Sequence, residues 1–123
     1  MILSIDGFEF NNKEPIYLQI IELIKKNIAL GVLTPGMKLP SVRELSKELG
    51  VNPNTLQRAY GELERIGITY TKRGMGSFIS EGDSEVMNLK EDMGRQLVKK
   101  FIEEMKAIGI DKDEAIEIIK MEE

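Results

Sequence analysis

Apolar residues recur every three or four positions along most of the chain, which predicts a mainly helical protein. The first such run begins after Pro15 and carries the isoleucines Ile16, Ile20, Ile24 and Ile28. Proline suits the first turn of a helix, and Gly31 is a plausible stop. The pattern therefore predicts a helix from residue 15 to about residue 30.

Two shorter amphipathic segments follow and are separated by a glycine. Ser41 with Glu44 three residues later forms a capping-box signature, and Gly50 ends that segment. Asn52 can cap the next segment, with Pro53 in its first helical position. Val42, Leu45 and Leu49 form an apolar stripe on the first segment, and Leu56, Ala59, Tyr60 and Leu63 form the predicted buried face of the second. Two helices joined by about three residues predict a helix-turn-helix.

A β-hairpin is predicted after Gly67. Residues 68–71 form the first strand, residues 72–77 (KRGMGS) a tight loop, and residues 78–79 the returning strand. Residues 34–41, with Pro-Gly and Leu-Pro steps, predict a turn and a short extended piece. The order of these elements is that of a winged helix-turn-helix.

The last third of the chain has a different pattern. A polar segment at residues 81–85 precedes an apolar stripe that predicts a helix ending near Gly109. The stripe consists of Val86, Leu89, Met93, Leu97, Phe101 and Met105. Asp111 can cap a last helix, whose apolar face would contain Ala115, Ile116 and Ile119. We predict a DNA-binding domain over residues 1–80 and a two-helix dimerisation tail over residues 81–123.

Composition narrows the possible functions. The 123 residues include neither cysteine nor histidine, so disulfides, thiolate metal sites and histidine-based catalysis are excluded. Neither a membrane span nor the basic start of a signal peptide is evident, and a cytoplasmic location is expected. We predict neither an enzyme nor a bound cofactor or metal.

Charge is divided unevenly along the chain. Residues 1–80 carry ten Lys and Arg against eight Asp and Glu, a balance of +2, whereas residues 81–123 carry seven against thirteen, a balance of −6. The net charge of −4 therefore comes from the tail, and the first domain is free to present a basic face.

The third predicted helix has a polar side that could read DNA. At 100° per residue, Asn54 and Arg58 lie opposite Leu56, with Gln57 on the flank. The N-terminal part of this helix enters the major groove in helix-turn-helix proteins, where amides pair with adenine and arginine with guanine. Alternatively, Asn52 only caps the helix and the other three are ordinary solvated residues.

Basic residues elsewhere could hold phosphates. Lys72 and Arg73 lie beside Gly74 in the hairpin loop, where a backbone can approach a groove closely. Arg43 lies in the first turn of its helix, where a cation opposes the helix dipole, so a nearby phosphate would explain it. The alternative for Arg43 is a salt bridge to Glu44 or Glu48.

The tail admits alternatives of its own. Its carboxylates lack the spacing of an EF-hand, so a solvated helix face is favoured over a calcium site. Its apolar stripe must pack within the chain or against a second copy. A dimer would suit a helix-turn-helix protein, because such proteins read two half-sites.

Residues 15–80 closely resemble the GntR family of bacterial transcription regulators, and most of all its YtrA-type branch with a short helical tail. The motifs are G-x-L-x-P-G-x-x-L-P-S-x-R-E-L at residues 31–45, VNPNT at residues 51–55, AY-x-E-L-E at residues 59–64 and RGMGSF at residues 73–78. The resemblance implies DNA contacts by Arg43, Asn52, Asn54, Thr55, Gln57 and Arg58, with Arg73 and Gly74 in the minor groove. Many members carry a basic residue at the position of Pro53, so their base code does not transfer.

These observations predict a homodimeric repressor that binds an inverted repeat in double-stranded promoter DNA, with no membrane partner. The tail is too short for a large ligand-binding domain, so the sequence names no small-molecule effector. The alternatives are a winged-helix module that binds proteins instead of DNA, an enzyme, and an activator, since the position of the operator decides between repression and activation.

Overall fold

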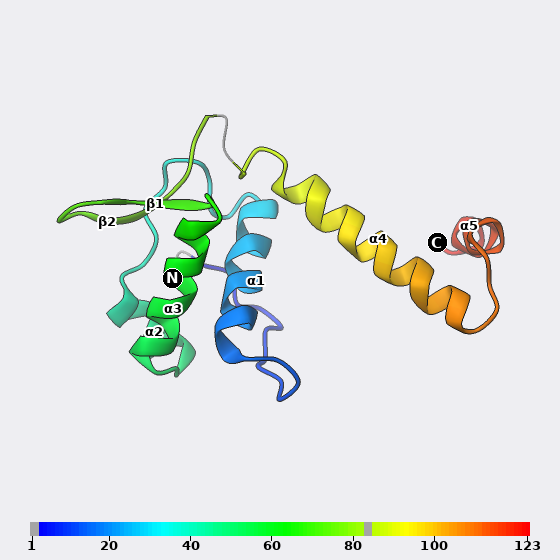
Figure 1. The fold of residues 1–123 in the computed structure, drawn as a ribbon, viewed down its shortest axis with the longest axis horizontal. Helices are drawn as coiled ribbons and strands as arrows, with labels where there is room; N and C mark the ends of the chain where they lie inside the picture. The colour runs from blue at the N-terminus through cyan, green and yellow to red at the C-terminus, as the bar shows by residue number, and fades with distance from the viewer. Residues whose placement is uncertain (1–2, 83–84) are drawn as a thin grey trace. The chain divides into compact units, whose positions relative to one another are not determined.

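The structure is a computed structural model that describes residues 3–82 and 85–123 (Figure 1). It contains five helices and a two-stranded sheet in this part of the chain, so it is mainly helical, as predicted. The elements are α1 (Ile16–Ala29), α2 (Val42–Leu49), α3 (Pro53–Arg65), β1 (Thr69–Lys72), β2 (Gly76–Ile79), α4 (Leu89–Ala107) and α5 (Lys112–Met121). The chain divides into two compact units, Met1–Lys90 and Glu91–Glu123.

Two buried polar residues of α1 hold the N-terminal segment in place. The Asn27 side chain accepts a hydrogen bond from the Ser4 amide at 2.6 Å and donates to the Ser4 carbonyl at 3.1 Å. The Gln19 side chain likewise accepts from the amide of Asn11 and donates to its carbonyl. Because buried polar groups are costly when unpaired, these bonds fix the path of the segment that precedes α1. The periodicity of the isoleucines showed the helix but not this anchoring.

The helix-turn-helix forms as the sequence predicts. Ser41 and Glu44 make both bonds of a capping box, and Gly50 closes α2 in the left-handed conformation at φ 66°. The Asn52 side chain caps α3 by accepting from the Asn54 amide at 2.8 Å, with Pro53 in the first turn. Leu56, Ala59, Tyr60 and Leu63 are the buried residues of α3.

The hairpin has a shorter loop than the sequence suggested. Lys72 pairs with Gly76 across the two strands, and the Met75 amide bonds to the Lys72 carbonyl at 2.9 Å. The loop is therefore residues 73–75, and the prediction of a loop over residues 72–77 was wrong. Backbone pairing draws Lys72, Gly76 and Ser77 into the strands.

Residues 36–40 form the linker before α2, and this linker pairs with β2 as a third extended segment beside the hairpin. The Gly36 amide bonds to the Ile79 carbonyl, the Ile79 amide to Met37 and the Leu39 amide to Ser77, each at 2.8 Å. Lys38 forms an isolated antiparallel bridge with Phe78. The linker is therefore hydrogen-bonded to the hairpin, which is the wing of the winged helix.

The first unit has a well-packed interior between its helices and its hairpin. Figure 1 shows α1 and α3 side by side, and these two helices contact each other directly. Side chains with almost no exposure come from every element of the unit, including Ile20, Ile24, Leu45, Leu56, Leu63 and Ile79. This packing fixes the orientation of α3 within the unit.

The second unit consists mainly of α4 and α5. The helix α4 begins at Leu89, so Val86 of the predicted stripe precedes it in a turn. Asp111 caps α5 by accepting from the Glu114 amide at 2.9 Å, as predicted. Ala115 is the buried residue of α5, whereas Ile116 and Ile119 of the same predicted face are exposed.

The predicted domain boundary remains a prediction. The polar segment that marks it includes residues 83–84, which lie outside the described residues. Among the described helices, none is both long and apolar enough to cross a bilayer.

Candidate nucleic-acid interface

The helix α3 has one buried side and one polar exposed side. Asn54, Gln57 and Arg58 are exposed, and Thr55 is half-buried beside them. The Asn52 oxygen is occupied by its bond to the Asn54 amide, so its observed role is that of the cap. In the described part of the chain, the side chains of Asn54 and Gln57 make no hydrogen bond with other protein groups. Their amides are available to an external partner.

Arg58 is exposed but not unrestrained. Its guanidinium carbon lies 3.8 Å from the centre of the Tyr17 ring, which belongs to the second residue of α1. A cation above an aromatic face at this distance is attracted by the negative face of the ring. Among the described residues, Arg58 forms no hydrogen bond or salt bridge.

The carboxylate nearest along the helix is bound by another arginine. Arg65 donates to both oxygens of Glu62, with its Nε at 3.1 Å from each and its Nη2 at 2.9 Å from Oε2. The hydrogen bonds from Arg65 lower the pKa of Glu62, and the same bonds raise the pKa of Arg65. Glu62 lies one helical turn beyond Arg58, and its carboxylate is already paired with Arg65.

Arg43 lies in the first turn of α2 and is exposed. Glu44, one of its suggested partners, instead accepts from the Ser41 amide at 3.3 Å. The hydrogen bonds from Ser41, first from its side chain and then from its backbone, lower the pKa of Glu44. In the described part of the chain Arg43 forms no salt bridge with Glu44 or Glu48.

The wing presents cations around a glycine-containing tip. Arg73 and Gly74 are exposed in the three-residue loop, and Gly74 adopts φ 77°. The Lys72 ammonium lies 4.6 Å from the centre of the Phe78 ring, so its stem runs along the hairpin. A side chain at Gly76 would approach the Lys38 stem to 3.1 Å, which shows that Lys38 passes close over the strand.

Tyr60 joins α3 to the chain that enters α2. Its hydroxyl donates to the Pro40 carbonyl at 2.6 Å. Burial, and to a smaller extent the nearby Glu44 carboxylate, raises the pKa of Tyr60, so it keeps its proton at all physiological pH values. Residues 36–40 are consequently tied to β2 on one side and to α3 on the other.

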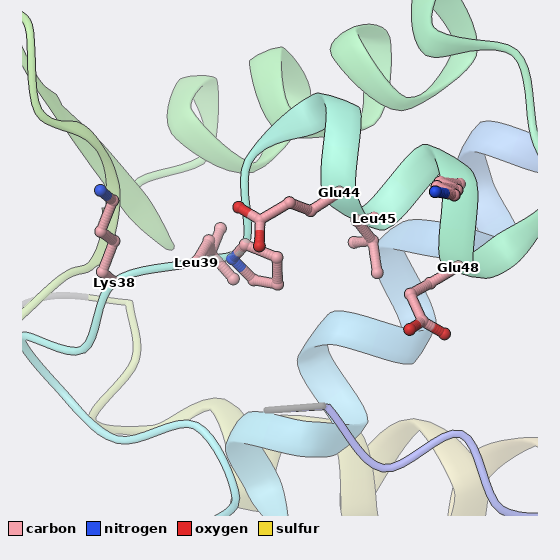
Figure 2. A pocket seen from close by; sticks show the side chains of 7 residues that line it. Lys38, Leu39, Glu44, Leu45 and Glu48 are labelled. Atoms are coloured by element: carbon pink, nitrogen blue, oxygen red, sulfur yellow. The ribbon is translucent and has the colours of Figure 1, made fainter.

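An open hollow of about 660 Å³ lies beside this linker. Figure 2 shows Glu44, Leu45 and Glu48 on α2, with Lys38 and Leu39 across from them on the linker. Lys47 also lines the hollow, so positive and negative side chains occur together. This mixture favours neither an anionic nor a cationic small molecule.

The predicted contact residues thus come from α2, α3 and the hairpin of one unit. Tyr17, Lys38 and Met75 lie beside the predicted contact residues, and sequence reasoning did not name them as part of the site. Met75 is 58% exposed at the tip of the wing. The position of Met75 between two glycines of a predicted hairpin loop could have revealed it. Tyr17 and Lys38 had no such signal, because their neighbours lie far along the sequence.

Known proteins share these features. Residues 16–79 match the family described as bacterial regulatory proteins, gntR family. The chain is 46% identical to the uncharacterized HTH-type transcriptional regulator YhcF of Bacillus subtilis (strain 168), over 91% of this chain and 93% of YhcF. It is 42% identical to the HTH-type transcriptional repressor YtrA of the same organism, over 86% of this chain and 82% of YtrA.

Solved structures agree with the fold. A GntR family transcriptional regulator from Listeria monocytogenes superposes with a TM-score of 0.85 at 44% identity, covering 93% of this chain and all of that one. The DNA-binding domain of AraR in complex with operator ORE1 superposes with a TM-score of 0.53 at 31% identity, covering 58% of this chain and 90% of that one.

The matched family and relatives are transcriptional regulators rather than enzymes, as the composition predicted. The match spans the helix-turn-helix and the wing, and the similarity to YhcF and YtrA continues into the tail. The chain belongs to the GntR family and is a transcriptional regulator with a DNA-binding winged helix-turn-helix.

Proposed function

We propose that the protein is a homodimeric repressor that binds an inverted repeat in promoter DNA. The observation that carries this proposal is the division of α3 into two sides. Leu56, Ala59 and Leu63 are buried, while Asn54, Gln57 and Arg58 are exposed on the same helix. A fold that needs only the first set leaves the second set free to read base edges.

The contacts follow from side-chain chemistry. Asn54 and Gln57 can each pair with the two adenine groups in the major groove, and Arg58 with guanine O6 and N7. Thr55 can contact either a base or a phosphate. Asn52 serves mainly by capping the helix, whose N-terminus favours a nearby phosphate.

The flanking cations hold the duplex. Arg43 lacks a carboxylate partner among the described residues, and its charge is unfavourable at a helix N-terminus unless an anion binds there. Lys72 and Arg73 bind the backbone or the minor groove from the wing, where Gly74 permits a close approach.

The tail supplies the dimer. On α4, Leu97 is 69% exposed and Phe101 is 38% exposed. Large apolar side chains clustered on one helix favour a partner surface, and a second copy would place two reading helices on two half-sites. The similar protein YtrA is named a transcriptional repressor, which supports repression as the direction of regulation. We place the protein in the cytoplasm, where its DNA would be, and assign it no effector.

Selection of bound sequences from a random DNA pool with the full chain tests the proposal. The expected result is a consensus of two inverted half-sites with an adenine or guanine at the contacted positions. The matched control is the triple variant N54A, Q57A and R58A, which removes polar groups from the exposed side only. Recovery of no consensus by the parent chain would favour the protein-binding alternative, and a non-palindromic consensus would reject the symmetric dimer.

A further inference from the structure

We propose that Tyr17 is a positioning residue that holds Arg58 in the orientation for reading a base. The inference rests on the proposed function, because it concerns how Arg58 is presented to DNA. Tyr17 belongs to α1, which has no part in the predicted set of contacts. The support comes from the position of the Arg58 guanidinium over the Tyr17 ring, with the guanidinium carbon 3.8 Å from the ring centre.

The stack restrains Arg58 without using its hydrogen-bond donors. A guanidinium attracts an aromatic ring through its flat face, whereas its five N–H groups point outward in its own plane. Recognition of guanine uses two of those in-plane donors. Tyr17 can therefore restrain the Arg58 guanidinium while its hydrogen-bond donors stay open, which a salt bridge to a carboxylate would not allow.

The main intramolecular competitor for those donors is already occupied. Glu62 lies four residues after Arg58 and would be its natural partner on the same helix face. Arg65 donates to both oxygens of that carboxylate instead. Arg58 keeps its place on Tyr17, and no described carboxylate binds it.

Restraint before binding has a measurable consequence. An unrestrained arginine has many rotamers, and ordering it on DNA weakens the binding. A side chain that is already held loses less freedom on contact. Removing the ring should thus weaken the operator complex and should do so only when Arg58 is present.

Binding of the full chain to its selected operator tests this with two variants. Tyr17→Leu removes the aromatic face and should weaken binding about two- to tenfold, the range for ordering one flexible side chain on binding. It should also reduce the preference for the base that Arg58 reads. Tyr17→Phe keeps the face and should restore both the affinity and the preference. In the R58A background, Tyr17→Leu should weaken binding no further.

The other outcomes overturn the proposal. Equal losses in Tyr17→Phe and Tyr17→Leu would show that the hydroxyl contacts DNA directly. Equal losses with and without Arg58 would show that Tyr17 acts through the fold. Urea unfolding of each variant checks folding, and Tyr17→Gln replaces Tyr17→Leu should the latter unfold.

Failure of the proposed function gives a different result. If the parent chain selects no DNA sequence at all, both the proposed function and the positioning role of Tyr17 are rejected. A coupling between Tyr17→Leu and R58A in unfolding experiments would then identify the stack as purely structural. If the parent binds its operator and Tyr17→Leu binds equally well, only the positioning role is rejected.

Discussion

The winged unit buries most of its large apolar side chains, whereas the tail leaves most of its own exposed. In the first, Leu45, Leu56 and Leu63 have no exposed surface, because three helices and a hairpin enclose them. In the second, Leu97, Phe101 and Ile119 remain exposed, and Ala115 is the buried residue of residues 91–123. The winged unit is a complete folding unit by this measure. The tail carries apolar surface that a partner would cover, and the proposed dimer depends on it.

The largest expected effect concerns that surface. Phe101→Asp should dissociate the proposed dimer, because burying an apolar side chain contributes about 1.5–3 kcal/mol and a twofold interface contains it twice. The dissociation constant should rise at least about a hundredfold. Sedimentation measures it, with Lys99→Asp on the opposite side of α4 as a control that changes the charge even more. A parent chain that sediments as a monomer would show that the exposed apolar side chains of the tail do not form a dimer interface.

The next effect concerns the enclosed core. Leu63→Ala should lower the free energy of unfolding by about 2–5 kcal/mol, because it leaves a cavity in a fully buried site. Leu30→Ala is the control, since Leu30 is 63% exposed and its truncation should change stability by only about 0.5 kcal/mol. Urea unfolding measures both. Similar losses in the two variants would mean that the winged unit is not packed as described.

A smaller effect separates the two kinds of DNA contact. Arg58→Ala should cost about 1–3 kcal/mol at the preferred operator and relax the preference at one base pair. Arg73→Ala should weaken binding to all sequences similarly and flatten the salt dependence by about one ion. Titrations at several salt concentrations distinguish them, and neither variant should change the oligomeric state. Loss of the dimer in either would link reading to the tail directly.

The smallest effect concerns the start of α2. Ser41→Ala should lower the free energy of unfolding by about 1 kcal/mol, the usual loss for a removed N-cap. The pH dependence has a definite sign, because the Ser41 hydrogen bonds lower the pKa of Glu44 from 4.5. The stability that the ionised Glu44 carboxylate contributes to the fold is complete above pH 4.5 and is lost as the pH falls through the lowered pKa. Glu44→Gln should lose less stability than the parent between pH 6 and 3, and equal losses would rule out this contribution.

Local signals predicted much of the fold. The Ser41–Glu44 pair, Gly50 and the Asn52-Pro53 step each act on their own backbone, so the bounds of α2 and α3 followed from a few neighbouring residues. The exposed side of α3 followed in the same way from the helical period. Strand pairing was less accessible, and the loop was therefore predicted too long.

Contacts between distant residues could not be predicted. The stack of Arg58 on Tyr17 depends on how α1 lies against α3, and the path of Lys38 over Gly76 depends on the pairing of the linker with β2. Periodicity shows which side of a helix is polar, but it does not show which of its side chains is held by a neighbour. Tyr17 and Lys38 are of this second kind, because their contacts join segments that are far apart in the sequence.

The double attachment of residues 36–40 has a mechanical consequence. Three backbone bonds join this linker to β2, and the Tyr60 hydroxyl joins it to α3, so the wing and the reading helix cannot shift independently. The wing and α3 would therefore contact the double helix at a fixed separation from each other. Such a protein would distinguish DNA by its local twist as well as by its bases, and over- or underwound operators should be bound less tightly even when every contacted base is unchanged.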